Sequence, residues 1–351
     1  MREHRERVKR GITPSVNLCL LDGRDVARLL PMARCIQLME GVLLALQAGK
    51  ATQPLRSMTR LPDKRGLLGL MPAILEDPAI MGVKILSVFP ENTGTQMGSH
   101  QGAVLLFETS SGRPLALVDA AAITAIRTAA VSAVATRLLA REDAGLLALL
   151  GSGVQARTHL QAILKVRRLR TVRVFSRNPA HAEAFARRES RRHDLEIMAV
   201  AKAREAVADA DIVCTVSGAP QPILKGDWLS PGTHINAVGA CTPGARELDG
   251  TAVARSRLFT DRRESLFAEA GDLLLAIQEG AVCREDVEVG ELGEVLEGSR
   301  AGRSHNGEIT LFESLGLAVE DLAAAYEVYE RAQQEDGGTW IPWEGERHAT
   351  D

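Results

Sequence analysis

The spacing of apolar and polar residues changes twice along the chain. Residues 24–50 carry apolar side chains at helical spacing and predict one or two helices. Between about residues 54 and 120 the apolar runs are short or alternating and are separated by Gly, Pro, Asn and Ser. This pattern predicts a mostly antiparallel sheet, with ETSSGRP as a hairpin turn.

A second pattern begins after an alanine-rich helix predicted around residues 120–140. Short apolar runs then alternate with helical segments, which is typical of a parallel sheet with right-handed crossovers. The predicted strands are GLLALLG, TVRVFSR, EIMAVA, ADIVCTVS, THINAVGA and SRLFTD. Near the end, SLGLAVEDLAAAYEVYERAQQ predicts a long amphipathic helix, and TWIPWEGERHATD reads as a polar tail. The chain therefore belongs to the α/β class.

Composition excludes several functions. The 351 residues suffice for more than one domain, and a net charge of -3 predicts no attraction to nucleic acid or to an anionic membrane. No apolar stretch looks long enough to cross a bilayer, and the charged start MREHRERVKR reads as a frayed leader rather than a secretory signal. The five cysteines are scattered and lack a C-x-x-C pair, which predicts reduced thiols, a cytoplasmic location and no metal site. Four of them, all but Cys241, are expected to be buried.

A glycine turn follows the first strand of the parallel pattern. In LLALLGSGVQA, residues Gly151, Gly153 and Ala156 fit G-x-G-x-x-A, with Val154 and Gln155 between them. The first glycine permits the tight turn, the second lets the backbone approach a pyrophosphate, and the small third residue allows close packing of helix on strand. Because a strand precedes this turn and a helix follows, it predicts a dinucleotide site.

The end of the next strand bears on the choice of cofactor. Units that prefer NAD usually carry an acidic residue there for the ribose 2′-hydroxyl. Here VFSRNP places Ser176, Arg177 and Asn178 at that point. Since Arg177 could pair with a 2′-phosphate, we predict that NADP(H) is preferred, with NAD(H) possible. The alternative is a solvated surface arginine.

Several segments in order resemble the ornithine cyclodeaminase/μ-crystallin family, from about residue 15 to 330. They are GVKILSVFPEN, ALVDAAAITAIRTAAVSAVATRLLA, GSGVQA, INAVGACTPGARELDG, EAGDLLLAIQEG, ELGEVLEG and ITLFESLGLAVEDLAAA. The resemblance implies a doubly wound Rossmann domain, placed at residues 125–316. It also implies a second α+β domain for substrate binding and dimerisation, placed at residues 1–124 and 317–351. A homodimer is therefore expected.

The resemblance also assigns substrate binding to Arg56, Lys84 and Arg127, with Lys84 and Arg127 as the catalytic candidates. The residues support this, because Arg127 is the only charge between residues 120 and 136 and Lys84 lies in an apolar strand. A buried cation is costly unless it is paired, and an anionic substrate could be its partner. The alternative is an internal salt bridge or a side chain that reaches solvent.

Other candidates follow the ends of predicted strands, where ligands of Rossmann sheets bind. Ser217, Val238 and Ala240 are expected near the cofactor, and Cys241 and Thr242 near the substrate. His100 is a weaker candidate for a proton donor, and a structural role is favoured for it. Cys241 stands where cyclodeaminases of the family carry a catalytic aspartate, and Gly69 stands where they carry an acid. Both departures favour an imine reductase over a cyclodeaminase.

The predicted function is reduction of a 2-imino acid or cyclic ketimine carboxylate to the amino acid, with hydride from the nicotinamide C4. A small amino or imino acid is thus the expected partner. The alternatives are an ornithine or lysine cyclodeaminase with recycled NAD, an alanine dehydrogenase-like enzyme, and a non-enzymatic ligand carrier.

Overall fold

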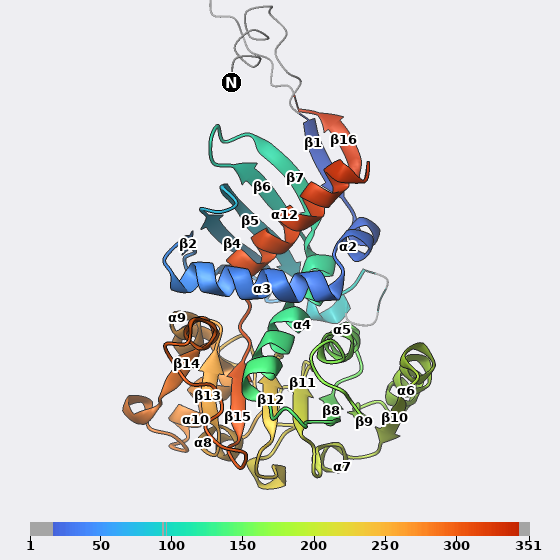
Figure 1. Cartoon of the computed structure of the whole chain (residues 1–351), viewed down its shortest axis with the longest axis vertical. Coiled ribbons are helices and arrows are strands. Elements are labelled where there is room, and N and C mark those ends of the chain that lie inside the picture. Colours follow the sequence, from blue (N-terminus) through green and yellow to red (C-terminus); the bar gives the residue numbers. More distant parts are fainter. Residues whose placement is uncertain (1–16, 93–94, 96, 344–351) are drawn as a thin grey trace, which may run out of the picture.

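Two eight-stranded sheets organise the chain. The computed structural model describes residues 17–92, 95 and 97–343, so the prediction for the charged N-terminal leader lies outside the described residues. Figure 1 shows the first sheet above the second, with helix α4 running between them. This arrangement confirms the predicted α/β class with one parallel and one mostly antiparallel sheet.

The first sheet has the strand order β16-β1-β7-β6-β5-β4-β2, with β3 beside β4. Its strands are β1 (Asn17–Leu21), β2 (Ala51–Thr52), β3 (Ser57–Arg60), β4 (Leu67–Leu75), β5 (Ile80–Val88), β6 (His100–Glu108), β7 (Pro114–Asp119) and β16 (Thr339–Pro342). All pairs are antiparallel except β1 with β7. The prediction of a polar tail was wrong for Thr339–Pro342, because these residues pair with β1.

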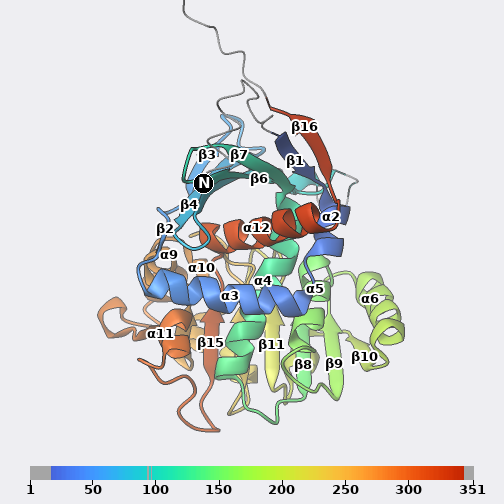
Figure 2. The same ribbon diagram turned by 45° about the horizontal axis from the view of Figure 1, so that its top comes forward.

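Three helices accompany this sheet: α2 (Gly23–Leu29), α3 (Met32–Gln47) and α12 (Ala318–Gln334). Pro31 precedes α3, and the axes of α2 and α3 differ by 86°, so residues 24–50 form two helices. Since proline cannot continue a helix from the preceding turn, the break falls where the sequence places it. Figure 2 shows α12 across one face of the sheet and α3 beside it.

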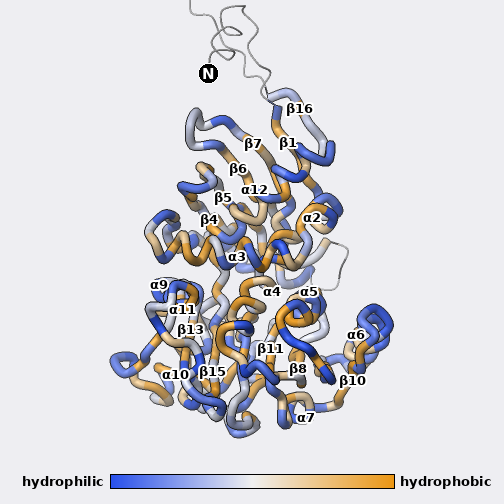
Figure 3. The backbone as a smooth tube through the Cα atoms, viewed as in Figure 1, coloured by the Kyte–Doolittle hydropathy of each residue, from blue (hydrophilic) through white to orange (hydrophobic). Residues whose placement is uncertain are grey.

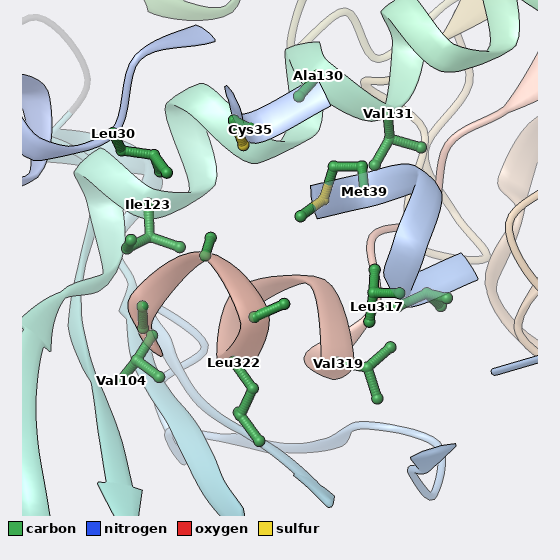
Figure 4. Packing of buried hydrophobic residues seen from close by; sticks show 14 of the residues in the cluster. Leu30, Cys35, Met39, Val104, Ile123, Ala130, Val131, Leu317, Val319 and Leu322 are labelled. Atoms are coloured by element: carbon green, nitrogen blue, oxygen red, sulfur yellow. The ribbon is translucent and has the colours of Figure 1, made fainter. Parts of the chain in front are cut away.

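Apolar side chains from distant segments meet around α12. Figure 4 shows residues of this cluster on both sides of α12, among them Val319 and Leu322 of α12, Met39 of α3, Val131 of α4 and Val104 of β6. All five are buried. This packing fixes the start of α12 against the first sheet, and the start of α12 is where two site residues are found.

The second sheet is entirely parallel, with the order β10-β9-β8-β11-β12-β15-β13-β14. Its strands are β8 (Leu146–Leu150), β9 (Thr171–Phe175), β10 (Glu196–Val200), β11 (Ile212–Thr215), β12 (His234–Ala237), β13 (Arg257–Thr260), β14 (Val289–Glu291) and β15 (Thr310–Glu313). The order reverses between β8 and β11, and ligands of such sheets bind at that switch point, beyond the carboxyl ends of the strands.

Short helices connect these strands: α5 (Val154–Ile163), α6 (Pro179–His193), α7 (Ala203–Val207), α8 (Gly250–Ala254), α9 (Arg263–Glu269), α10 (Gly271–Gln278) and α11 (Leu292–Glu297). Figure 3 shows that the strands are largely hydrophobic, whereas the outer helix α6 is mostly hydrophilic. Six of the eight strands were predicted. The missed strand β14 has only three residues, and the apolar run of β15 continues through Leu315 toward α12.

Helix α4 (Ala120–Leu139) joins the two halves. Asp119 caps it by accepting a hydrogen bond from the backbone N–H of Ala122 at 2.7 Å. With a mean hydropathy of 1.3 it is long and apolar enough to cross a membrane, contrary to the sequence prediction, but 72% of that window is buried inside the protein. It is therefore a core helix. The predicted domain boundary at residue 125 falls within it, and the division into two domains stays a proposal.

Candidate active site

The glycine turn lies at the switch point of the parallel sheet. Gly151 follows β8 and has a φ of +132°, and a Cβ on it would lie 2.6 Å from the carbonyl oxygen of Val216. Both facts require glycine at this position. A Cβ on Gly153 would meet nothing within 4 Å. The second glycine therefore leaves the backbone open, as a closely approaching pyrophosphate needs.

Helix α5 starts directly after this turn. Gly153 is its N-cap without a side-chain cap, and the first helical bond runs from Arg157 N–H to the Gly153 carbonyl. The N–H groups of Val154, Gln155 and Ala156 therefore have no helical acceptor. Val154 is 57% exposed and Ala156 is fully buried, as the motif predicts. These donors and the helix dipole fit the pyrophosphate of a dinucleotide.

The end of β9 presents the residues expected to select the cofactor. Ser176 is half-buried and Arg177 is exposed. Among the described residues no ion pair or hydrogen bond engages the Arg177 guanidinium. Asn178 caps α6, because its side-chain oxygen accepts from Ala180 N–H at 3.1 Å. Its oxygen therefore serves the helix, and only its amide group could contact a cofactor.

Glu247 holds the ends of β11 and β12 together. One carboxylate oxygen accepts from the N–H (2.7 Å) and the hydroxyl (2.6 Å) of Ser217, and the other accepts from Gly239 N–H at 2.7 Å. Burial raises the pKa of Glu247, while these hydrogen bonds oppose the rise. The Ser217 hydroxyl thus donates within the protein. Val238 is half-buried and Ala240 is buried, so they shape the wall at this edge.

Lys84 and Arg127 meet around one carboxylate of α12. The Lys84 Nζ lies 2.5 Å from one oxygen of Asp321, and the Arg127 Nε donates to the other at 2.8 Å. The Nη1 of Arg127 donates to Glu320 at 3.1 Å. The Lys84 and Arg127 side chains are each 4% exposed, and the two acids are fully buried. The predicted burial of both cations is confirmed, but their partners in the structure are internal acids.

The charges in this cluster shift each other's titration. Burial lowers the pKa of Lys84 to about 8, although Asp321 opposes the shift. Burial alone would lower the pKa of Arg127, but the charges of Asp321 and Glu320 outweigh it and raise the value. The two cations likewise hold the pKa of Asp321 below its usual value against the effect of burial. Burial raises the pKa of Glu320 to about 8, although Arg127 opposes the rise.

Arg56 approaches the same region from the segment between β2 and β3. Its Nη2 donates to the carbonyl oxygens of Leu315 (2.6 Å) and Gly316 (3.2 Å) and lies 2.7 Å from Glu269. Asp261 accepts from the N–H groups of the same two residues at 3.0 and 2.8 Å. Gly316 also packs against the Arg127 guanidinium, and Arg127 shares Asp321 with Lys84, so the three predicted cations lie close together.

Gly316 shapes the space in front of Arg127. It has a φ of +76°, and a Cβ on it would lie 2.7 and 2.9 Å from the two terminal nitrogens of Arg127. Nε and Nη1 already have acceptors, whereas no hydrogen bond engages Nη2 among the described residues. Glycine therefore lets the backbone pack closely against the guanidinium, where a side chain would displace it.

The remaining candidate residues are only partly buried or lie outside the cation cluster. Cys241 and Thr242 are half-buried in the segment after β12, and Cys283 is exposed, so only Cys19, Cys35 and Cys214 are buried. The expectation of four buried cysteines was wrong for Cys283. At Gly69 the position of a Cβ lies 2.8 Å from the Met58 sulfur, so a thioether fills the place expected for an acid in a cyclodeaminase.

His100 is the first residue of β6 rather than part of a loop, and its Nδ1 forms a hydrogen bond with the Ser99 hydroxyl at 2.9 Å. Partial burial and the charge of Lys84 lower its pKa. The imidazole is therefore neutral near pH 7.

Sequence reasoning missed the acids that face the cations: Asp261, Glu269, Glu320 and Asp321. The argument used for Arg127 would have found two of them, because Glu320 and Asp321 stand at the start of a helix that is otherwise apolar on its buried side. Asp261 and Glu269 follow or end short elements and carry no comparable signal.

The fold and the glycine turn define a dinucleotide-binding protein of the Rossmann class. It also carries a buried cluster in which Arg56, Lys84 and Arg127 pair with internal acids. The chain belongs to the ornithine cyclodeaminase/mu-crystallin family, whose model matches residues 17–336.

Individual relatives agree along most of the length. The ketimine reductase mu-crystallin of Mus musculus is 41% identical over 282 residues, which cover 80% of this chain and 86% of the relative. The structure of Thermococcus litoralis Δ1-pyrroline-2-carboxylate reductase with NADH and L-proline matches with a TM-score of 0.89 at 40% identity, covering 92% of this chain and 100% of that one. An archaeal alanine dehydrogenase dimer with bound NAD matches with a TM-score of 0.87 at 29% identity, covering 93% and 100%.

Proposed function

We propose that the protein reduces the C=N bond of a 2-imino acid or cyclic ketimine carboxylate to the amino acid, using a reduced nicotinamide cofactor. The observation that carries this proposal is the grouping of Arg56, Lys84 and Arg127. The dinucleotide turn is adjacent, since Gln155 at the start of α5 donates to the Thr124 carbonyl of α4 at 3.5 Å. The reductase relatives support it, since two act on such compounds by name and one holds NADH and L-proline together.

In the proposed reaction the chain's own residues bind and orient the substrate. Arg56, the free Nη2 of Arg127 and the ammonium of Lys84 would hold the substrate carboxylate. Asp321 fixes Arg127 and Lys84 in place. The glycine turn and the Ala240–Thr242 segment would hold the nicotinamide cofactor, which would supply the hydride. Positioning of the C=N carbon by three cations removes much of the entropic barrier.

A panel assay tests the proposal. We expect rapid oxidation of NADPH with Δ1-pyrroline-2-carboxylate, Δ1-piperideine-2-carboxylate, or pyruvate with methylamine or ammonia, followed by absorbance. Ammonia and proline from ornithine, with no imine reduction, would instead support a cyclodeaminase. Oxidative deamination of alanine alone would support a dehydrogenase, and tight NADPH binding without any turnover would support a carrier. The Met58 sulfur beside Gly69 and the thiol at Cys241 disfavour the cyclodeaminase.

We further propose that NADP(H) is preferred over NAD(H), with Arg177 as the residue that pairs with the 2′-phosphate. The Arg177→Ala variant is expected to raise the KM for NADPH about 10- to 100-fold, the equivalent of one or two charge-assisted hydrogen bonds, and to leave the KM for NADH nearly unchanged. Steady-state kinetics with both cofactors measure this. Arg187→Ala, on the exposed side of α6, is the matched control. A clear NADH preference of the unaltered protein would refute the proposal.

We also propose a homodimer that forms through the first sheet. The face of this sheet that α12 does not cover exposes Leu68, Leu70 and Ile74 of β4 and Ile85 of β5, and Leu117 of β7 lies on it as well. An apolar surface of this kind is typical of a protein interface. The dimeric alanine dehydrogenase with the same fold supports a second copy as the partner.

We also propose a cytoplasmic location. All five cysteines are free, which supports it.

A further inference from the structure

Glu269 differs from the other acids that face the three cations. It is the last residue of α9, and its Oε2 forms an ion pair with the Arg56 Nη2 at 2.7 Å that lacks the geometry of a hydrogen bond. Glu269 is 9% exposed, whereas Glu320 and Asp321 are fully buried. Each of those two is also held by a backbone or side-chain donor: Leu317 N–H for Glu320 and Arg127 Nε for Asp321.

The chain after Glu269 packs against the segment where the nicotinamide is expected. Gly271 N–H donates to the Ala240 carbonyl at 3.1 Å, and a Cβ on Gly271 would lie 2.5 Å from the Thr242 carbonyl oxygen. Glu269 therefore precedes by two residues the glycine that contacts the Ala240–Thr242 segment. Its side chain contacts Arg56. It is the carboxyl group of the site that lies between a substrate-binding cation and the cofactor edge.

We propose that Glu269 is the catalytic acid that protonates the imine nitrogen of the substrate. This inference rests on the proposed function. The carboxylic acid O–H bond breaks and an N–H bond forms, which gives an iminium ion beside the Glu269 carboxylate. The C=N carbon then takes the hydride that the reduced nicotinamide supplies, and the C=N π electrons become the lone pair of the amine. One imine, one NADPH and one proton thus yield one amine and NADP+.

The ion pair with Arg56 explains how the acid becomes protonated at the right moment. Burial raises the pKa of Glu269, whereas the charge of Arg56 opposes the rise. When the substrate carboxylate binds Arg56, it competes with Glu269 for that cation. A carboxyl group that loses its counter-ion in a partly buried site favours the neutral form. Substrate binding therefore draws a proton onto Glu269, which then transfers it to the nitrogen.

Two substrates separate proton donation from a structural role. With Δ1-pyrroline-2-carboxylate at pH 8, Glu269→Gln is expected to lower kcat about 10²- to 10⁴-fold, the usual range for a lost general acid. With N-methyl-Δ1-pyrrolinium-2-carboxylate, whose nitrogen already carries its charge, the same variant should stay within a few-fold of the unaltered enzyme. NADPH affinity should be unchanged. Glu264→Gln is the control, since Glu264 is an exposed acid in the first turn of the same helix that pairs with Arg262.

Calorimetry gives a readout that needs no turnover. Pyrrole-2-carboxylate is a planar carboxylate whose nitrogen is not basic. Its binding to the NADP+ complex, titrated in two buffers of different ionisation enthalpy, should take up a fraction of a proton in the unaltered protein and in Glu264→Gln. The Glu269→Gln variant should take up none.

Equal loss of activity on both substrates, or the same proton uptake in Glu269→Gln, would overturn the assignment of Glu269. If the unaltered protein reduces no imine, the proposed function fails, and the proton uptake on binding still decides whether Glu269 titrates against Arg56.

Discussion

Replacing Arg127 by Met is expected to have the largest effect on this protein. The variant loses the free guanidinium edge that would bind the substrate carboxylate, so kcat/KM for the imine should fall about 10²- to 10³-fold, the equivalent of two charge-assisted hydrogen bonds. It also removes the cation that faces the buried Glu320 and shares Asp321 with Lys84. Breaking a buried ion pair from one side typically costs about 3–5 kcal/mol of unfolding free energy. Urea denaturation and steady-state kinetics measure both losses.

A double variant separates these two losses. In Arg127→Met/Glu320→Gln the Lys84–Asp321 pair keeps its balance of charge, and no acid is left without its cation. Stability should therefore recover in large part, whereas kcat/KM should stay low. Arg137→Met is the control, because Arg137 lies on the same helix with an exposed side chain that pairs with Glu40, and exposed pairs contribute about 0–1 kcal/mol. Activity of Arg127→Met within three-fold of the unaltered protein would refute the substrate role.

The two glycines of the dinucleotide turn should respond differently to the same change. Gly151→Ala places a Cβ against the Val216 carbonyl at a φ of +132°. We expect a loss of about 2 kcal/mol or more in stability from backbone strain, together with loss of NADPH binding. At Gly153 a Cβ has open space on the protein side and an allowed φ of -85°. Gly153→Ala should cost less than about 1 kcal/mol in stability. It should still raise the Kd for NADPH more than about ten-fold, because the methyl group occupies the space of the pyrophosphate.

Fluorescence titration measures the NADPH affinity of the two variants, and thermal unfolding measures their stability. Gly41→Ala on helix α3 is the control, since a Cβ there also meets nothing within 4 Å and the position is far from the turn in sequence. Unchanged NADPH affinity in Gly153→Ala would contradict the placement of the pyrophosphate at this turn.

The elements that sequence reasoning found are those whose signal is local. The β8–Gly151–α5 unit follows from the order of a short apolar run, two glycines and a helical segment, all within twenty residues. For residues 24–50 the sequence left one or two helices open, and in the structure Pro31 separates α2 from α3. Strand β15 was missed although it lies in the middle of the sheet, because its apolar run continues through Leu315 toward α12. Its buried position also depends on β12 and β13 on either side.

The same distinction between local signals and tertiary contacts applies to the site residues. Arg127 could be recognised as a buried cation because one charge interrupts a run of small apolar residues. Its partners could not, since Asp321 and Glu320 lie 194 and 193 residues away along the chain and reach it only after α12 has packed on α4. The same holds for Arg56 and Glu269, which come from different halves of the protein.

The sequence by itself determined the class of fold, the dinucleotide turn, the absence of an acid at Ser176–Asn178, and the presence of cations within apolar segments. These properties depend on residue types at short spacing, where chain geometry alone dictates the outcome. Only the tertiary structure decided which acid faces which cation and that Gly316 packs against the guanidinium of Arg127. It also placed Glu269 between Arg56 and the cofactor edge. Electrostatic interactions act through space over a few ångströms, so their partners are selected by packing and not by position along the chain.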